Sequence, residues 1–190
     1  MAHTHHYRAR VAWTGSTGAG YRSYSRRHRV QTPPAAAELA LSADPSFRGD
    51  PTLTNPEQLL LAAASSCQLL SFLALAARDR LDVLAYDDDA EAVMPAGDQP
   101  VRITSIVLRP RIVVGPGTDH DRVRQLVQDA HRDCYIANTL TAEVVLEPVV
   151  LNDEGQAVTG VTEPDLPVMG GRGGPRRQPA GALVRETKRS

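Results

Sequence analysis

The stretch TNPEQLLLAAASSCQLLSFLALAARDR, residues 54–80, decides the fold of this chain. Asn55 is a favoured helix N-cap, Pro56 suits the first helical position, and Glu57 in the first turn is stabilised by the positive end of the helix dipole. Ala and Leu, which have high helix propensity, dominate the rest. The stretch therefore predicts one long helix that begins at Asn55 and ends near residues 78–80.

Within this helix, residues 59–77 form an apolar run interrupted only by Ser65, Ser66, Gln68 and Ser71. The run approaches the length that spans a bilayer. Its polar residues, however, cluster near the centre, where they cost most in lipid, and no aromatic belt flanks it. We therefore expect a helix buried on nearly all sides, inside a domain or a dimer, and keep a membrane anchor as the alternative.

Apolar and polar residues alternate at 7–13 and at 101–114, and this alternation predicts a strand at each place. Further strands are expected at 21–31, 83–92 and 142–151, with a short extended piece at 38–41. Pro148 places the last strand at a sheet edge. A second helix begins at Thr118 or Asp119 and ends near Cys134. The order β-β-α-β-β-α-β, with two helices and a largely antiparallel sheet, predicts an α+β fold.

Length and composition are those of one soluble globular domain. The chain has 190 residues, of which 42% are hydrophobic and 23% charged, and its formal net charge is -1. That balance gives no bias toward nucleic acid or a membrane surface. The chain does not begin with a secretory signal pattern, and two cysteines do not suit a secreted disulfide framework, so we expect a cytoplasmic protein. Composition predicts a domain at 1–152 and a disordered, Gly/Pro/Arg-rich tail at 153–190.

Cys67 and Cys134, the two cysteines of the chain, could form a redox pair. A peroxidatic cysteine attacks as a thiolate, and its sulfenic acid product can condense with a second thiol to give a disulfide. Cys67 lies among serines and Gln68 in an otherwise apolar helix, which suits an apolar peroxide reaching a reactive sulfur. From the residues alone, two cysteines that simply pack are the more common case.

Two segments resemble the OsmC/Ohr family of peroxide reductases. The first is TNPEQLL, residues 54–60, followed by Cys67 ten positions after the glutamate; the second is AHRDC, residues 130–134, at the end of the second predicted helix. The resemblance covers roughly residues 7–151. It implies an OsmC-like α+β fold with antiparallel sheets, two main helices and an intertwined homodimer.

The resemblance also implies roles for individual residues. Cys67 matches the peroxidatic cysteine, Cys134 the resolving cysteine and Glu57 the active-site carboxylate. The family also has an arginine that pairs with this carboxylate and favours the thiolate. Its position in the OsmC branch, which we prefer, matches Arg48, and its position in the Ohr branch matches Arg22. The reaction implied is reduction of an organic hydroperoxide to an alcohol, with a dithiol such as a lipoyl group as reductant and no metal or organic cofactor.

The chain departs from the family pattern beside both cysteines. Gln68 follows Cys67 where the family often has an apolar residue, and Tyr135 follows Cys134 where the family commonly has proline. These departures bear on the substrate more than on the fold.

Helix geometry adds a constraint on the site. On one unbroken helix, Glu57 and Cys67 are separated by roughly 15 Å of rise and do not share a face. Either the helix kinks after Glu57, or a partner subunit supplies Glu57 to the thiol. The apolar surface of the helix favours the second alternative.

Two functions of other classes stay open. The chain could be an OsmC-fold binding protein that holds an apolar ligand without peroxidase turnover, or a membrane-associated protein anchored by residues 59–77. His131 and Cys134 have the spacing of two zinc ligands, but no second pair accompanies them, so we expect no metal site. We interpret the acidic run at 87–89 as a solvated loop or strand edge.

Overall fold

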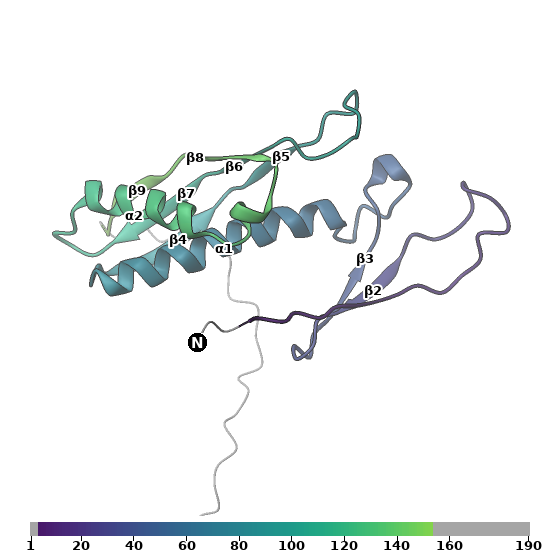
Figure 1. Cartoon of the computed structure of the whole chain (residues 1–190), viewed down its shortest axis with the longest axis horizontal. Coiled ribbons are helices and arrows are strands. Elements are labelled where there is room, and N and C mark those ends of the chain that lie inside the picture. The colour runs from purple at the N-terminus through teal and green to yellow at the C-terminus, as the bar shows by residue number, and fades with distance from the viewer. Residues whose placement is uncertain (1–3, 154–190) are drawn as a thin grey trace, which may run out of the picture. The chain divides into compact units, whose positions relative to one another are not determined.

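The computed structural model describes residues 4–153 (Figure 1). Its elements in chain order are β1 (Arg10–Ala12), β2 (His28–Gln31), β3 (Glu38–Leu41), the 3-10 turn η1 (Pro45–Phe47), α1 (Pro56–Arg78), β4 (Val83–Asp88), β5 (Glu91–Val93), β6 (Ser105–Leu108), β7 (Pro110–Val114), α2 (His120–Asp133), the 3-10 turn η2 (Ala137–Thr139), β8 (Glu143–Leu146) and β9 (Val149–Asn152). The two predicted helices and the α+β class are confirmed. Apart from Asp153, the predicted tail lies outside the described residues.

The start of α1 is held by a capping box. The Asn55 side chain accepts a hydrogen bond from the Gln58 N–H at 2.8 Å, and the Gln58 side chain accepts one from the Asn55 N–H at 3.0 Å. Two N–H groups that have no partner inside the helix are thereby satisfied. The helix then runs without a break to Arg78, so the predicted bounds are confirmed and no kink separates Glu57 from Cys67.

Within one chain, α1 buries a single stripe. Its buried residues recur every four positions and are Ala64, Gln68, Phe72 and Ala76. By length and composition the helix could cross a membrane, and 22% of its most apolar window is buried. Leu70, on another side of the helix, is 63% exposed. Burial on nearly all sides is therefore not achieved within one subunit, so burial of this helix inside a dimer stays a prediction.

The strands after α1 form two three-stranded sheets, with the orders β4-β7-β9 and β5-β6-β8. Each of the three predicted strands in this region is in fact two strands, and the two halves belong to different sheets. β4 and β5 pair antiparallel with β7 and β6, whereas β8 and β9 pair parallel with β6 and β7. The parallel pairs arise because α2 carries the chain back before β8. The sheets are thus more mixed than predicted, and Pro148 lies between two edge strands, as expected.

The three divisions coincide with side-chain contacts that meet at one place in the fold. Between β6 and β7, the Arg109 N–H donates to the Asp88 side chain at 2.7 Å instead of to a backbone carbonyl. Pro110 and Pro148, which follow two of the divisions, have no N–H to give to a ladder. The Arg109 side chain forms ion pairs with Glu91 at 3.2 Å and with Glu147 at 3.0 Å. All three divisions therefore lie next to one another.

Two apolar clusters join the helices to these sheets. The first is made by α1, α2, β7 and β9, with Phe72, Val127 and Ile112 fully buried at its centre. The second is made by Ala64 of α1 and by β6, with partly buried residues from β8 and from the two positions that flank η2. α1 contributes to both clusters, so its middle lies where they meet.

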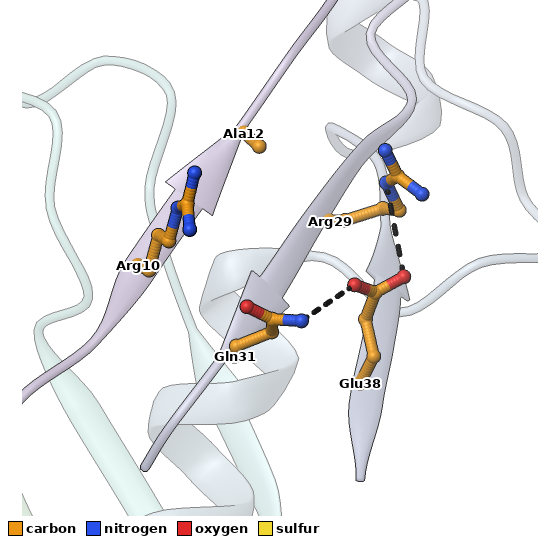
Figure 2. A pocket seen from close by; sticks show the side chains of 5 residues that line it. All are labelled: Arg10, Ala12, Arg29, Gln31 and Glu38. Atoms are coloured by element: carbon orange, nitrogen blue, oxygen red, sulfur yellow. Dashed lines mark hydrogen bonds and ion pairs between the residues drawn. The ribbon is translucent and has the colours of Figure 1, made fainter. Parts of the chain in front are cut away.

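The separate β1-β2-β3 sheet has one polar and one apolar face. Its register places five side chains on one face, where they line a pocket (Figure 2): Arg10, Ala12, Arg29, Gln31 and Glu38. Glu38 accepts a hydrogen bond from Gln31 at 3.1 Å and forms an ion pair with Arg29 at 3.7 Å. The alternate positions include Val11 and Leu39, which are exposed. Around Val11 and Leu39, the apolar face of this sheet is therefore uncovered in the described part of the chain, whereas Leu41 on the same face is buried.

Candidate active site

Cys67 lies in the middle of α1 and is half-buried. It follows Ala64 of the second apolar cluster by almost one turn and precedes Phe72 of the first cluster by more than one turn. The neighbouring Gln68 is fully buried, and its Nε2 donates to the Val127 carbonyl of α2 at 3.0 Å. This bond fixes the turn of α1 that carries the thiol against α2.

Cys134 is the residue at which α2 ends. Its backbone leaves the helical region, with φ -71° and ψ 112°, and its N–H donates to the His131 carbonyl at 3.2 Å. The side chain is 1% exposed, and the sulfur accepts a hydrogen bond from the Ala137 N–H at 3.5 Å. The predicted place of this cysteine at the end of the second helix is confirmed.

Packing of α1 against α2 brings the two thiols together. The pKa of Cys134 is raised to about 11, first by burial and then by its hydrogen bond with Cys67 and by the charge of Cys67. Both cysteines are free thiols. The two thiols are therefore close enough for Cys67 to raise the pKa of Cys134, and Cys134 is protonated near neutral pH.

Two residues of β4, which sequence reasoning did not select, line the same region. Asp88 is half-buried rather than solvated, and it accepts a hydrogen bond from the Ser65 hydroxyl of α1. Tyr86, two positions earlier and so on the same face, packs against Phe72 with ring centroids 6.0 Å apart. Burial, followed by the charges of Asp88 and Cys134, raises the pKa of Tyr86 above its ordinary value. Strand alternation pairs Tyr86 with Asp88, but only packing shows that they face α1.

Buried polar atoms without a hydrogen-bond partner gather around these elements. Within residues 4–153 they are Glu57 Oε2, Gln68 Oε1, Tyr86 Oη and His131 Nδ1. Gln68 adjoins Cys67, and His131 lies one turn before Cys134. Native proteins leave few such atoms, and those that remain are common at functional sites. The elements that carry the two thiols and Tyr86 thus hold buried hydrogen-bonding groups that are not used within the described residues.

The predicted arginine does not reach the thiols within one chain. Arg48 is exposed, has φ 66°, and lines a pocket with Tyr24, Asp50 and their neighbours. Arg22 is exposed in the segment before β2. Neither arginine side chain forms a hydrogen bond or ion pair with another described residue. Glu57 therefore keeps a buried carboxylate oxygen without a cation beside it.

The loop that carries Arg48 is nonetheless tightly built. Asp44 caps η1 by accepting from the Ser46 N–H at 2.8 Å, and the same residue accepts from the Asn55 side chain at 3.3 Å. At Gly49 an added Cβ would lie 1.5 Å from the Ala43 carbonyl oxygen, so only glycine fits. The loop is therefore fixed to the start of α1, close in sequence to Glu57.

His131 and Cys134 have the spacing of two zinc ligands, but no third ligand joins them in the described residues. In the described ranges no group of three or more His, Cys, Asp or Glu side chains is placed to hold a metal ion.

Comparison with known proteins places these features in one family. The family model described as OsmC-like protein matches residues 49–148. A search of curated protein sequences finds no match. Among solved structures, the chain is similar to an OsmC-like protein of unknown function from Vibrio cholerae, at 28% identity and a TM-score of 0.70, covering 77% of this chain and 100% of that one.

More distant structures share the fold. An organic hydroperoxide resistance protein from Legionella pneumophila matches at 18% identity and a TM-score of 0.57, over 79% of this chain and 99% of that one. One from Elizabethkingia anophelis matches at 17% identity and a TM-score of 0.60, over 80% and 100%. Since the family model covers more than half of the sequence and includes both cysteines, the chain belongs to the family of OsmC-like proteins.

Proposed function

We propose that this protein is a thiol-dependent peroxidase that reduces organic hydroperoxides to alcohols. The observation that carries the proposal is that Cys67 of α1 lies close enough to Cys134, at the end of α2, to raise its pKa. Organic hydroperoxide resistance proteins among the structures of the same fold agree with it. A pair of thiols that only filled space would not need to be adjacent.

The first step takes place at Cys67. Its thiolate attacks the outer peroxide oxygen, so an S–O bond forms, the O–O bond breaks, and the alkoxide leaves and takes a proton to become the alcohol. The sulfur is oxidised to a sulfenic acid and the peroxide is reduced. Cys67 suits this step because it is half-buried, and so more accessible than Cys134, on a helix otherwise rich in Ala and Leu.

The second step uses Cys134. Its sulfur attacks the sulfenic sulfur of Cys67, an S–S bond replaces the S–O bond, and the thiol proton leaves with the hydroxide as water. An external dithiol, for which a lipoyl group is our candidate, then reduces the disulfide by exchange. The packing of α1 against α2 supports this step because it brings the two thiols near each other. The chain's own residues suffice for both steps without a cofactor.

The site is completed by a second copy of the chain, which supplies Glu57 to the Cys67 thiol, and Arg48 pairs with Glu57 in the assembled dimer. Arg48 has no side-chain partner among the described residues, and Glu57 has a buried oxygen without one. A buried carboxylate without a partner is costly, and a guanidinium is its best partner. Two apolar surfaces that need cover, the outer side of α1 around Leu70 and the apolar face of β1-β2-β3, favour an intertwined homodimer.

One equivalent of cumene hydroperoxide, added to the reduced protein, tests the chemistry. We expect the loss of two thiols and a chain lighter by two hydrogens, which marks an intrachain disulfide. Cys67→Ser should abolish peroxide consumption, whereas Cys134→Ser should consume one equivalent and stop. Full retention of thiols in the wild-type chain would favour the alternative, an OsmC-fold protein that binds an apolar ligand.

The dimer and the location have their own tests. Leu70→Asp should convert a dimer into a monomer by light scattering, and Arg48→Ala should lower the peroxide rate without changing the dimer. Cell fractionation should place the protein in the cytoplasm. Recovery in the membrane pellet would support the alternative of an anchor at residues 59–77.

A further inference from the structure

Of the four residues in the buried stripe of α1, only Gln68 is polar, and the mechanism above does not use it. The other three are Ala64, Phe72 and Ala76. Gln68 is fully buried and immediately follows Cys67. An amide side chain among apolar neighbours loses its hydrogen bonds with water and has to recover them inside the protein. The bonds that Gln68 makes therefore indicate what its amide does.

Only half of this amide is satisfied. Its Nε2 donates to the Val127 carbonyl at 3.0 Å, whereas its Oε1 is closed to solvent and has no hydrogen-bond partner in the described part of the chain. An unpaired buried acceptor costs at least as much free energy as one neutral hydrogen bond contributes. A methionine, which has a similar length and no polar atom that needs a partner, would fill the same space without that cost. Stability alone therefore does not account for a glutamine at position 68.

The hydrogen bond joins the two helices that carry the thiols, and it has a direction. Gln68 is next to Cys67 on α1, and Val127 lies about two turns before Cys134 on α2. Apolar burial is non-directional, so it resists separation of two helices more than it resists a small slide or rotation. A hydrogen bond, in contrast, is confined to a narrow range of distance and angle. The Gln68 amide therefore sets the position of the Cys67 turn along α2.

A second side-chain link between the same helices lies away from the thiols. Arg122, in the first turn of α2, forms an ion pair with Asp79, the residue at which α1 ends. Both side chains are partly exposed, and exposed ion pairs contribute little to stability. Asp79 lies about three turns of α1 from Cys67. This link joins the helices without constraining the turn that carries the thiol.

We infer that Gln68 is a positioning residue for disulfide formation, because its amide holds α1 on α2 where the Cys134 sulfur can reach oxidised Cys67. The inference rests on the proposed function. In the step concerned, an S–S bond forms, the S–O bond of the sulfenic acid breaks, and hydroxide leaves as water with the thiol proton. Cys134 is oxidised and the sulfenic sulfur is reduced. Gln68 acts through the two helices and has no part in the attack on the peroxide.

Gln68→Met tests the inference, with Arg122→Gln as the matched control. After one equivalent of cumene hydroperoxide, we expect Gln68→Met to oxidise Cys67 at the wild-type rate. It should form the disulfide roughly 10- to 100-fold more slowly, which is the effect of a misplacement of about 1 Å. A sulfenic acid trap such as dimedone should capture more Cys67, and the urea midpoint should equal or exceed that of the wild type. Arg122→Gln, which removes the other link, should form the disulfide at the wild-type rate.

The equilibrium of the thiol pair with dithiothreitol supplies a readout that needs no peroxide. To keep half of the chains in the disulfide form, Gln68→Met should need a ratio of oxidised to reduced dithiothreitol roughly 10-fold higher than the wild type needs. A wild-type rate or a wild-type ratio in Gln68→Met overturns the inference. An equal effect of Arg122→Gln also overturns it, as does a large fall in the urea midpoint or a failure of Gln68→Met to fold. If peroxide leaves the wild-type thiols intact while the ratio still shifts, the proposed function fails and the positioning role stands.

Discussion

The Cys134 thiol should react with iodoacetamide about 100-fold more slowly in the folded chain than in the unfolded chain at pH 7. Its pKa rises from the ordinary 9.0 to about 11. Because only the thiolate attacks, this rise lowers the reactive fraction at pH 7 by about two orders of magnitude. The sulfur is also 1% exposed, which slows the reagent further. The factor of 100 is thus a lower limit.

The assay is competitive alkylation of the reduced protein, with peptide mass spectrometry to separate Cys67 from Cys134. The same chain in urea supplies the reference rate for each thiol. Cys67 should be labelled first, and the rate at Cys134 should keep rising with pH up to about 11. Labelling of Cys134 at the unfolded rate at pH 7, or a plateau at pH 9, would refute the reasoning.

The same shift gives the stability of the protein a pH dependence with a definite sign. A folded pKa above the unfolded value means that the folded chain holds the proton more tightly. The contribution of Cys134 is therefore complete below pH 9 and is lost as the pH rises through 11, with a loss on the order of 2 to 3 kcal/mol. Urea unfolding at pH 8 and pH 11 should show a larger loss for the wild type than for Cys134→Ser. Equal losses would count against the shift.

Three substitutions test the scaffold. Asn55→Ala removes one half of the capping box and should lower the free energy of unfolding by about 1 kcal/mol in urea, whereas Asn55→Asp, which keeps the accepting oxygen, should lower it less. Phe72→Ala empties a fully buried site and should cost about 3–5 kcal/mol in the same measurement; a loss below about 1 kcal/mol would place Phe72 outside the core. Gly49→Ala puts a Cβ 1.5 Å from a carbonyl oxygen, so the loop bearing Arg48 must move. We expect Gly49→Ala to lower the peroxidase rate, as Arg48→Ala should. Unchanged activity of Gly49→Ala would exclude Arg48 from the site.

Local signals in the sequence predicted the helices well. The cap at Asn55, the Ala/Leu composition up to Arg78 and the position of Cys134 at the end of α2 all depend on residues close together in the chain, and the structure confirms each of them. The sequence predicted where the strands after α1 lie, but not that each of the three is divided into two. Each of these three segments was interpreted as one continuous strand, so the divisions near residues 89, 109 and 147 were not predicted.

The division of the strands follows from contacts between residues far apart in sequence. Asp88 takes the Arg109 N–H, and the Arg109 side chain meets both Glu91 and Glu147. None of these partners can be chosen without the pairing of the sheets. The same limit applies to Tyr86, because alternation assigns it a face but does not tell which helix covers that face.

By itself, the sequence determined the α+β class, the capped helix that carries Cys67, the placing of Cys134 at a helix end and, through two motifs, the family. Only the tertiary structure decided that the two thiols come close enough to interact, that Cys134 is held protonated, that Tyr86 and Asp88 pack against α1, and that Arg48 does not reach the thiols within one subunit. The physical reason is the distance along the chain over which each interaction acts. Caps and helix propensity act over a few residues, whereas the pKa of a thiol depends on burial and on charges that arrive from the rest of the chain.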